Sequence, residues 1–203
     1  MSAIGITGGI STGKSTFSDC VGGILPGARF FNADEAAHAL TKLAEVKEEI
    51  RAEFGSGVFS RDGDLNREKL RAIIFGDATK KRALERILHP RIRREWRAEA
   101  TRHRNSPDFF FADIPLLYET GGETLCDAVV VVACSHKVQL VRLMERMSIN
   151  DTEAEQMIRS QMPLEEKMAR ADHVVWNDGS RAAVMEQARF LAALWQQQPW
   201  TKS

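Results

Sequence analysis

The sequence has few cysteines and no long hydrophobic run. Its three cysteines, Cys20, Cys126 and Cys134, are an odd number, and none of their spacings matches a metal or redox motif. We therefore expect free thiols in a reducing cytoplasm. No apolar run approaches the ~18 residues of a membrane-spanning helix. The first residues also lack the basic and apolar regions of a signal peptide. These absences predict a cytoplasmic protein with no membrane partner.

The chain also lacks net charge, because 28 lysines and arginines balance 28 aspartates and glutamates. A neutral chain is not steered as a whole toward nucleic acid or membrane, so any anion has to be held by local groups. The basic run from Lys80 to Arg104 fits either a solvated pair of helices or a pocket for an acceptor that carries phosphates. We expect no nucleic-acid partner, because the rest of the chain offsets this charge.

Short apolar runs alternate with longer amphipathic segments along the 203 residues. The runs are bounded by turn residues or charges, as strands buried on both faces are. Such alternation predicts an α/β fold with a five-stranded parallel sheet and helices on both faces, in three layers. The predicted strands are Ala3–Thr7, Arg29–Asn32, Phe109–Asp113, Ala128–Ala133 and His173–Trp176. The predicted helices are Lys14–Leu25, Glu35–Phe54, Asn66–Arg104, Lys137–Arg146, Asp151–Gln161, Leu164–Ala171 and Arg181–Gln198.

Two segments are longer than a simple crossover between parallel strands. One runs from Phe54 to Arg104, and its helical pattern is interrupted near Gly76 and at Pro90, where we expect one helix to end and another to begin. The other runs from Lys137 to Ala171. Ligands bind at the carboxyl edge of such sheets, so we interpret both segments as insertions that cover an active site. The prediction is a single domain, residues 1–203, with an inserted subdomain at about 54–104 and a lid at about 137–171.

The segment from Gly8 to Ser15 matches the pattern G-x-x-x-x-G-K-[ST] directly after a predicted strand and before a predicted helix. Glycines let backbone N–H groups face phosphate oxygens, and the helix presents its positive end to the same charge. Lys14 is placed to bridge the β- and γ-phosphates, and the Ser15 hydroxyl to hold Mg²⁺. The pattern predicts a bound nucleoside triphosphate and does not name the acceptor. The expected nucleotide contacts are Gly8, Gly9, Ser11, Thr12, Gly13, Lys14, Ser15 and Thr16.

A kinase is favoured over other phosphate-loop proteins. No asparagine begins the Asn-Lys-x-Asp guanine-reading motif of GTPases. A kinase needs a carboxylate that accepts the proton of the acceptor hydroxyl. Asp34 directly follows the second predicted strand. In a parallel sheet the carboxyl ends of the first and second strands can face one pocket, so Asp34 can approach the γ-phosphate. Its alternative role is to cap the following helix. Asp113, at the end of the third predicted strand, is either a Mg²⁺ ligand through water or a turn aspartate.

Six motifs of one known family occur in the right order along the chain. They are Thr7–Thr16 for the family's T-G-G-I-G-S-G-K-S-T, Asn32–Asp34 for its D-A-D, Arg71–Phe75 followed by Leu84–Pro90, Pro115–Glu119 for P-L-L-[FY]-E, Gln139 with Arg142 and Arg146 for Q-x-x-R-x-x-x-R, and Ala171–Asn177 for A-D-x-V-x-x-N. With these motifs the chain resembles the dephospho-CoA kinase family over nearly its whole length. The resemblance implies a P-loop kinase fold that transfers phosphate from ATP to the ribose 3′-hydroxyl of dephospho-CoA, giving CoA and ADP. It also implies that the first insertion binds CoA.

Roles for single residues follow from the resemblance. Asp34 takes the family's catalytic-base position. Arg142 and Arg146 lie on one helix face and either neutralise the transferred phosphoryl group when the lid closes or form ordinary surface ion pairs. Asn177 lies near the adenine or merely ends the fifth strand. The expected substrate contacts are Thr7, Asp34, His38, Arg71, Phe75, His89, Leu116 and Glu119. For His38 a packed surface histidine is the alternative, and for Glu119 an ion pair with an arginine.

The sequence departs from the family pattern at two positions. Ser11 replaces a glycine, which costs about 1 kcal/mol if the position needs a positive φ angle. Asn32 replaces an aspartate and leaves Asp34 as the only carboxylate of its motif. Two other functions remain open: another small-molecule or nucleotide kinase, or a nucleotide-gated binding protein without turnover. We expect a monomer or a weak homo-oligomer.

Overall fold

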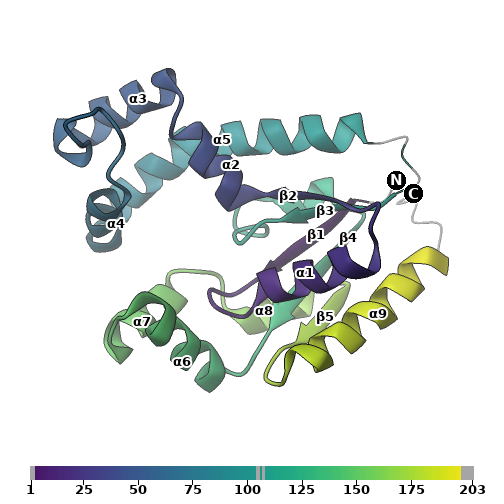
Figure 1. Ribbon diagram of the computed structural model, residues 1–203. Helices are drawn as coiled ribbons and strands as arrows, with labels where there is room; N and C mark the ends of the chain where they lie inside the picture. The colour runs from purple at the N-terminus through teal and green to yellow at the C-terminus, as the bar shows by residue number, and fades with distance from the viewer. Residues whose placement is uncertain (1–2, 104–105, 107, 198–203) are drawn as a thin grey trace. The chain divides into compact units, whose positions relative to one another are not determined.

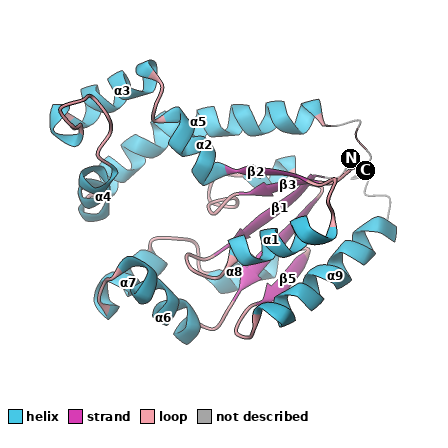
Figure 2. Cartoon of the chain, in the orientation of Figure 1, coloured by secondary structure: helices cyan, strands magenta, loops and turns pink. Residues whose placement is uncertain are grey.

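The structure is a computed structural model that describes residues 3–103, 106 and 108–197 (Figures 1 and 2). The chain divides into two compact units. The first contains Met1–Phe31 and Glu99–Ser203, and the second contains Asn32–Ala98. The first unit carries the sheet, and the second is helical.

The first unit is built on a five-stranded sheet, as the sequence predicts. The strand order is β2-β3-β1-β4-β5. In this sheet β1 pairs parallel to β3 and to β4, and β4 pairs parallel to β5. The strand bounds are β1 (Ala3–Gly8), β2 (Arg29–Asn32), β3 (Phe110–Asp113), β4 (Ala128–Ala133) and β5 (His173–Trp176). Because β1 lies at the centre, the loop that follows it opens in the middle of the carboxyl edge of the sheet.

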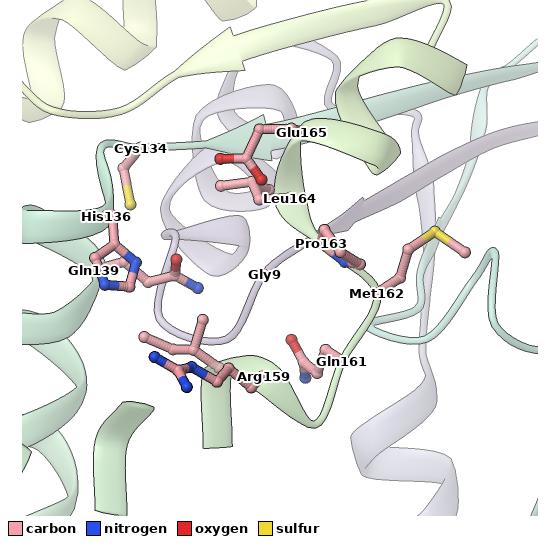
Figure 3. A pocket seen from close by; sticks show the side chains of 11 residues that line it. Gly9, Cys134, His136, Gln139, Arg159, Gln161, Met162, Pro163, Leu164 and Glu165 are labelled. Carbon is pink, nitrogen blue, oxygen red and sulfur yellow. The ribbon is translucent and has the colours of Figure 1, made fainter. Parts of the chain in front are cut away.

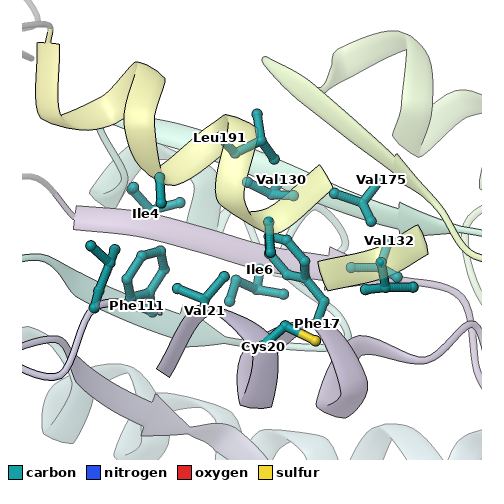
Figure 4. Packing of buried hydrophobic residues seen from close by; sticks show 14 of the residues in the cluster. Ile4, Ile6, Phe17, Cys20, Val21, Phe111, Val130, Val132, Val175 and Leu191 are labelled. Carbon is teal, nitrogen blue, oxygen red and sulfur yellow. The ribbon is translucent and has the colours of Figure 1, made fainter. Parts of the chain in front are cut away.

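One face of the sheet is covered by α1 (Lys14–Ile24) and α9 (Arg181–Gln197), which pack against each other. Alternate residues of the strands point into this layer, among them Ile4, Ile6 and Val130 (Figure 4). Phe17 of α1 and Trp195 of α9 complete a cluster with almost no solvent exposure. Burial of this apolar surface fixes the start of α1 against β1, and so it fixes both ends of the loop between them.

The opposite face is covered by the segment after β3 and by α8 (Leu164–Arg170), which packs against β4. At Gly5 an added Cβ would lie 2.8 Å from both the Cys126 sulfur and Leu117. The missing side chain therefore lets this segment, which includes the short helix η2 (Gly122–Leu125), lie flat on β1. Between β4 and α8 the chain forms α6 (His136–Met147) and α7 (Asp151–Arg159). The sheet with its two covered faces confirms the predicted α/β fold.

The second unit has its own small core. Its elements are α2 (Ala33–Leu40), α3 (Ala44–Phe54), η1 (Ser56–Val58), α4 (Arg67–Gly76) and most of α5 (Ala78–Arg102). Val46 and Ile50 of α3 pack with Val58, Phe59 and Leu70. This compact unit begins at Asn32 and includes α2 and α3, whereas the subdomain expected from the sequence covers about 54–104. The predicted helix Glu35–Phe54 is divided between α2 and α3.

The expected helix break at Pro90 is wrong, because α5 runs through Pro90 without interruption. Proline has no N–H and its ring crowds the preceding turn, so it costs a helix about 3 kcal/mol. The Arg91 guanidinium donates a hydrogen bond of 2.6 Å to the carbonyl of Ile87 in that turn. Arg91 also pairs with Glu49 of α3 at 2.5 Å. The side chain after the proline thus ties the turn to a neighbouring helix.

Two further expectations concern membranes and thiols. No helix in the described ranges is long and apolar enough to cross a membrane. Cys20, Cys126 and Cys134 are free and buried, as expected for thiols that pack as small apolar side chains.

The edge of the sheet at β5 is blocked by one side chain of α9. The Gln187 amide accepts a hydrogen bond from the Trp176 N–H at 2.9 Å and donates one to the Trp176 carbonyl, also at 2.9 Å. It therefore occupies the backbone groups that a further strand would use. Val174 and Trp176 are exposed on this strand, which makes an unblocked edge a template for self-association.

We predict that Gln187→Ala exposes this edge. Loss of two hydrogen bonds to the backbone should lower the free energy of unfolding by about 1–2 kcal/mol and cause concentration-dependent association. Thermal unfolding and light scattering after size exclusion measure both effects. The matched control is Gln196→Ala, an exposed position of the same helix. If the two variants melt and elute alike, Gln187 does not protect the edge.

Candidate functional site

The phosphate loop lies between β1 and the N-terminus of α1. The helix begins after Gly13, whose φ of 96° is left-handed, and no described side chain caps it or supplies an acidic group in its first turn. At Gly13 an added Cβ would lie 2.0 Å from the side-chain nitrogen of Asn177, so only glycine fits there. The uncapped positive end of α1 is a site for an anion, and Lys14 is its first residue.

Three amide side chains hold the backbone of this loop. Ile10 is held on both sides, because its N–H donates to Gln161 Oε1 at 2.9 Å and its carbonyl accepts from Gln139 Nε2 at 2.8 Å. Asn177 Nδ2 donates to the Thr12 carbonyl at 2.9 Å. Figure 3 shows the amides of Gln139 and Gln161 directed at the loop beside Gly9. The loop is therefore set from outside, by α6, by the segment after α7 and by the residue after β5.

Gly9 is the second position of the loop where the missing side chain matters. A Cβ at Gly9 would lie 2.5 Å from Gln139 Nε2, which would displace the amide that holds Ile10. Gly9 also lines a cavity of ≈ 290 Å³ between the loop and the predicted lid. The other residues that line this cavity are Cys134, His136, Gln139, Ile158, Arg159, Gln161, Met162, Pro163, Leu164 and Glu165 (Figure 3).

Ser11 adopts the conformation that the sequence analysis identified as costly. Its φ is 59°, in the left-handed region, where a side chain costs roughly 1–2 kcal/mol relative to glycine. Its hydroxyl is buried and has no hydrogen-bond partner in the described part of the chain. Such a group costs free energy until it finds an acceptor, and a phosphate oxygen in the loop would be one.

The residues expected at a magnesium ion fit that role. Ser15 is exposed in the first turn of α1. Ser18, one turn later on the same helix face, donates a hydrogen bond to Asp113 at the end of β3 at 3.5 Å. A hydroxyl and a carboxylate are oxygen ligands of the type that Mg²⁺ prefers, directly or through water. Asp113 therefore lies beside Ser18, one turn after Ser15 in α1.

The two lid arginines have different surroundings. Arg142 Nη1 donates to the Asn177 carbonyl at 2.8 Å, so it lies beside the loop and supports the residue that holds Thr12. Burial raises the pKa of the neighbouring Cys134 thiol to about 11, although Arg142 acts in the opposite direction. That thiol is protonated at neutral pH and is a poor nucleophile. Arg146, in the last turn of α6, is exposed.

Asp34 does not cap α2, which was the alternative to a catalytic role. The cap is Asn32, whose side chain accepts from the N–H groups of Asp34 at 2.9 Å and Glu35 at 3.1 Å. Asparagine caps helices as well as aspartate does, so the departure at Asn32 keeps the structural function of this position. Asp34 lies exposed in the first turn of α2, and His38 follows four residues later on the same face.

The other residues expected at the substrate are divided between the units. In the first unit, the buried Thr7 hydroxyl donates to the Pro115 carbonyl at 3.1 Å, and Leu116 is half-buried next to it. In the second unit, Arg71 is exposed on α4 and His89 is half-buried on α5. Burial lowers the pKa of His89, which Lys81 lowers further and Glu85 opposes. Phe75 lies in α4, and its side chain is outside the described part of the structure.

Glu119 pairs with a lysine, whereas the partners expected from the sequence are the acceptor or an arginine. Lys167 Nζ lies 2.8 Å from Glu119 Oε1, and the lysine side chain is 0% exposed. Neither Lys167 nor Gln161 is among the site residues expected from the sequence. A signal existed for Lys167, because Leu164, Lys167 and Met168 share one helix face, and a lysine in an apolar stripe predicts a buried cation. Gln161 gave no such signal.

The chain is similar in sequence to known proteins along most of its length. A family model described as dephospho-CoA kinase matches residues 2–183. The chain belongs to the dephospho-CoA kinase family. A dephospho-CoA kinase of Geobacillus kaustophilus is 39% identical over 194 residues, which are 95% of this chain and 96% of that relative. One of Anaeromyxobacter dehalogenans is 43% identical over 197 residues, 96% of this chain and 92% of the relative.

A solved structure gives the same result. The dephospho-CoA kinase from Campylobacter jejuni superposes with a TM-score of 0.65 at 26% identity, over 95% of this chain and 96% of that chain. The family match spans the phosphate loop, the whole helical unit and the amides that hold the loop. Family membership therefore concerns both compact units and not the phosphate loop alone.

We predict that Ser11→Gly, which restores the glycine of the family pattern, stabilises the protein. Relief of the left-handed strain should raise the free energy of unfolding by about 1 kcal/mol, as measured by denaturant unfolding without nucleotide. Ser11→Ala is the matched control, because it removes the unpaired hydroxyl and keeps the strained Cβ. Equal stabilisation by both variants would assign the effect to the hydroxyl and contradict the strain argument.

Proposed function

We propose that this enzyme transfers the γ-phosphoryl group of ATP to the ribose 3′-hydroxyl of dephospho-CoA, with CoA and ADP as products. This reaction is the last step of CoA biosynthesis. The observation that carries the proposal is the phosphate loop at the uncapped N-terminus of α1, in a chain that belongs along its length to the dephospho-CoA kinase family.

The loop binds the triphosphate of ATP. The reaction requires little covalent chemistry from the protein itself. Catalysis of phosphoryl transfer is mostly positioning and neutralisation of charge. The backbone from Ser11 to Thr16 grips the phosphates, and Lys14 contacts the β- and γ-phosphates. Mg²⁺, when bound to Ser15 and through water to Asp113, supplies positive charge to the phosphate oxygens. Asn177 lies at the nucleotide side of the loop, where its carbonyl is held by Arg142.

Asp34 acts as the general base toward the acceptor. It takes the proton of the 3′-hydroxyl as the bond from that oxygen to the γ-phosphorus forms. The bond from this phosphorus to the bridging oxygen breaks, and ADP leaves with the electron pair. Two features support this role: Asn32 performs the capping that Asp34 would otherwise perform, and the Asp34 side chain is exposed in the first turn of α2.

The remaining assignments complete the proposal. The helical unit binds dephospho-CoA, with contacts from His38, Arg71, Phe75 and His89. The lid carries Arg146, which neutralises the transferred phosphoryl group when the lid closes. Thr7, Leu116 and Glu119 shape the acceptor side of the loop. We expect a monomer or weak homo-oligomer that works in the cytoplasm.

The reaction is tested by measuring ADP release from ATP with and without dephospho-CoA, and by weighing the product. We expect strong stimulation by dephospho-CoA, a product heavier by one phosphate, and loss of turnover when EDTA removes Mg²⁺. ATP binding without stimulation would contradict the proposal. In that case other hydroxyl acceptors should be screened, and slow hydrolysis with none of them would indicate a nucleotide-gated binding protein.

We predict that Asp34→Asn lowers kcat by about 10²–10⁴-fold, the usual contribution of general-base catalysis. ATP affinity, measured by calorimetry, should stay close to that of the wild type. Glu35→Gln is the control, because it removes a neighbouring exposed carboxylate from the same helix turn. Turnover by Asp34→Asn at the level of Glu35→Gln would remove Asp34 from the role of base.

A further inference from the structure

Lys167 lies under the phosphate loop with a fully buried side chain. Its ammonium group is 2.8 Å from Glu119 Oε1, 3.0 Å from the Pro115 carbonyl and 3.5 Å from the Gly8 carbonyl. Gly8 is the last residue of β1 and the first of the loop. Pro115 also accepts the Thr7 hydroxyl at 3.1 Å. One buried cation therefore joins α8, the start of the loop and the segment after β3.

The partners of Lys167 indicate that it acts mainly by fixing the positions of neighbouring backbone atoms. Its electrostatic effect at a distance is the smaller contribution. With Glu119 at 2.8 Å the pair has no net charge, so its effect on distant phosphates is that of a dipole. Buried ion pairs also contribute little to stability, because the loss of hydration offsets the attraction. The pair still imposes directed contacts. The ammonium group can donate three hydrogen bonds, and it is surrounded by three oxygens from two segments: the carbonyl of Gly8, and the carbonyl of Pro115 and the carboxylate of Glu119 in the segment after β3.

The segment that leads into α8 makes a second contact with the phosphate loop, in addition to that of Lys167. Gln161 accepts the Ile10 N–H at 2.9 Å. The next residue, Met162, donates its own N–H to Glu119 Oε1 at 3.0 Å. The Glu119 oxygen that pairs with Lys167 thus also fixes the chain next to Gln161.

The C-terminal end of α8 is fastened to the same segment after β3. The Arg170 guanidinium lies 4.3 Å from the centre of the Tyr118 ring and 2.6 Å from a Glu123 oxygen. Burial raises the pKa of Tyr118 to about 12, so the ring under Arg170 is the neutral phenol. The predicted lid therefore ends in a helix that is anchored beside the sheet.

We propose that Lys167 and Gln161 are positioning residues that set the phosphate loop in its ATP-binding conformation. Lys167 fixes the carbonyl at the start of the loop, and Gln161 fixes the N–H two residues later. Neither has to touch a substrate. The inference rests on the proposed use of ATP, but it concerns the binding step and does not depend on the acceptor.

The main test is the double variant Lys167→Met with Glu119→Gln. Replacement of both charged partners avoids an unpaired buried charge, so the variant should fold with a Tm within a few degrees of the wild type. The hydrogen bonds to Gly8 and Pro115 are lost, and misplacement of the loop should raise the Kd for Mg-ATP about ten- to a hundred-fold. Calorimetry without acceptor measures this Kd, so that any contact of Glu119 with the acceptor has no influence.

A milder variant and a control complete the experiment. Gln161→Ala removes one neutral hydrogen bond from a half-buried position, and should raise the Kd for Mg-ATP about three- to ten-fold with an unchanged Tm. It gives the answer even if the double variant does not fold. Lys137→Met is the matched control, because it removes an exposed lysine from α6 and should bind ATP as the wild type does.

A structural role alone would give a different result from positioning. If the double variant and Gln161→Ala both bind Mg-ATP like the wild type, the residues only stabilise the fold and the inference is overturned. The same holds if Lys137→Met weakens binding equally. If the wild-type protein binds ATP but makes no CoA, dephospho-CoA is not the acceptor. The test of loop positioning remains valid in that case, because it measures ATP binding alone.

Discussion

The hydrogen bonds between side-chain amides and the phosphate loop are the constraint on which the rest of the site depends. A loop that turns its N–H groups toward a ligand cannot also use them within regular secondary structure, so its conformation has to be maintained by other parts of the chain. Gln139, Gln161 and Asn177 supply that support from three separate segments. The cost falls on the loop itself, because Gly9 and Gly13 leave no room for a side chain where the amides approach.

The need for these hydrogen bonds explains why several segments of the first unit meet at one edge of the sheet. The amides can reach the loop only if α6, the segment before α8 and the end of β5 all lie beyond the carboxyl end of β1. A parallel sheet with β1 at its centre brings these segments together. The packing of α1 and α9 on one face fixes the helix end of the loop, and Lys167 on the other side fixes its strand end. Binding of a nucleotide then requires little further ordering, which favours affinity.

Much of the first unit could be predicted from the sequence, and the reason is local. Each strand is a short apolar run between turn residues, and the glycines and Lys14 of the loop follow the first run directly. The helical unit was harder to predict, because its helices carry charges on most faces and its core is small. At Pro90 the local rule gave a wrong helix break, and Arg91 beside it pairs with Glu49 of α3, a contact that depends on tertiary structure. The cap formed by Asn32 does not follow from the loss of the aspartate charge, which is what the family pattern emphasises at this position.

The residues that sequence reasoning found least well are those that act on backbone atoms. Lys14 and Asp34 stand in motifs because their own chemistry demands a residue type. Gln161 and Lys167 recognise a carbonyl or an N–H of another segment, and any backbone offers these groups, so no pattern in the chain marks the partner. Family motifs contain the residues that we propose to contact the substrate, whereas contacts such as that of Lys167 with Gly8 become visible only when the distance between the two residues is known. For a reaction that depends on positioning, residues of the second kind set how well residues of the first kind can work.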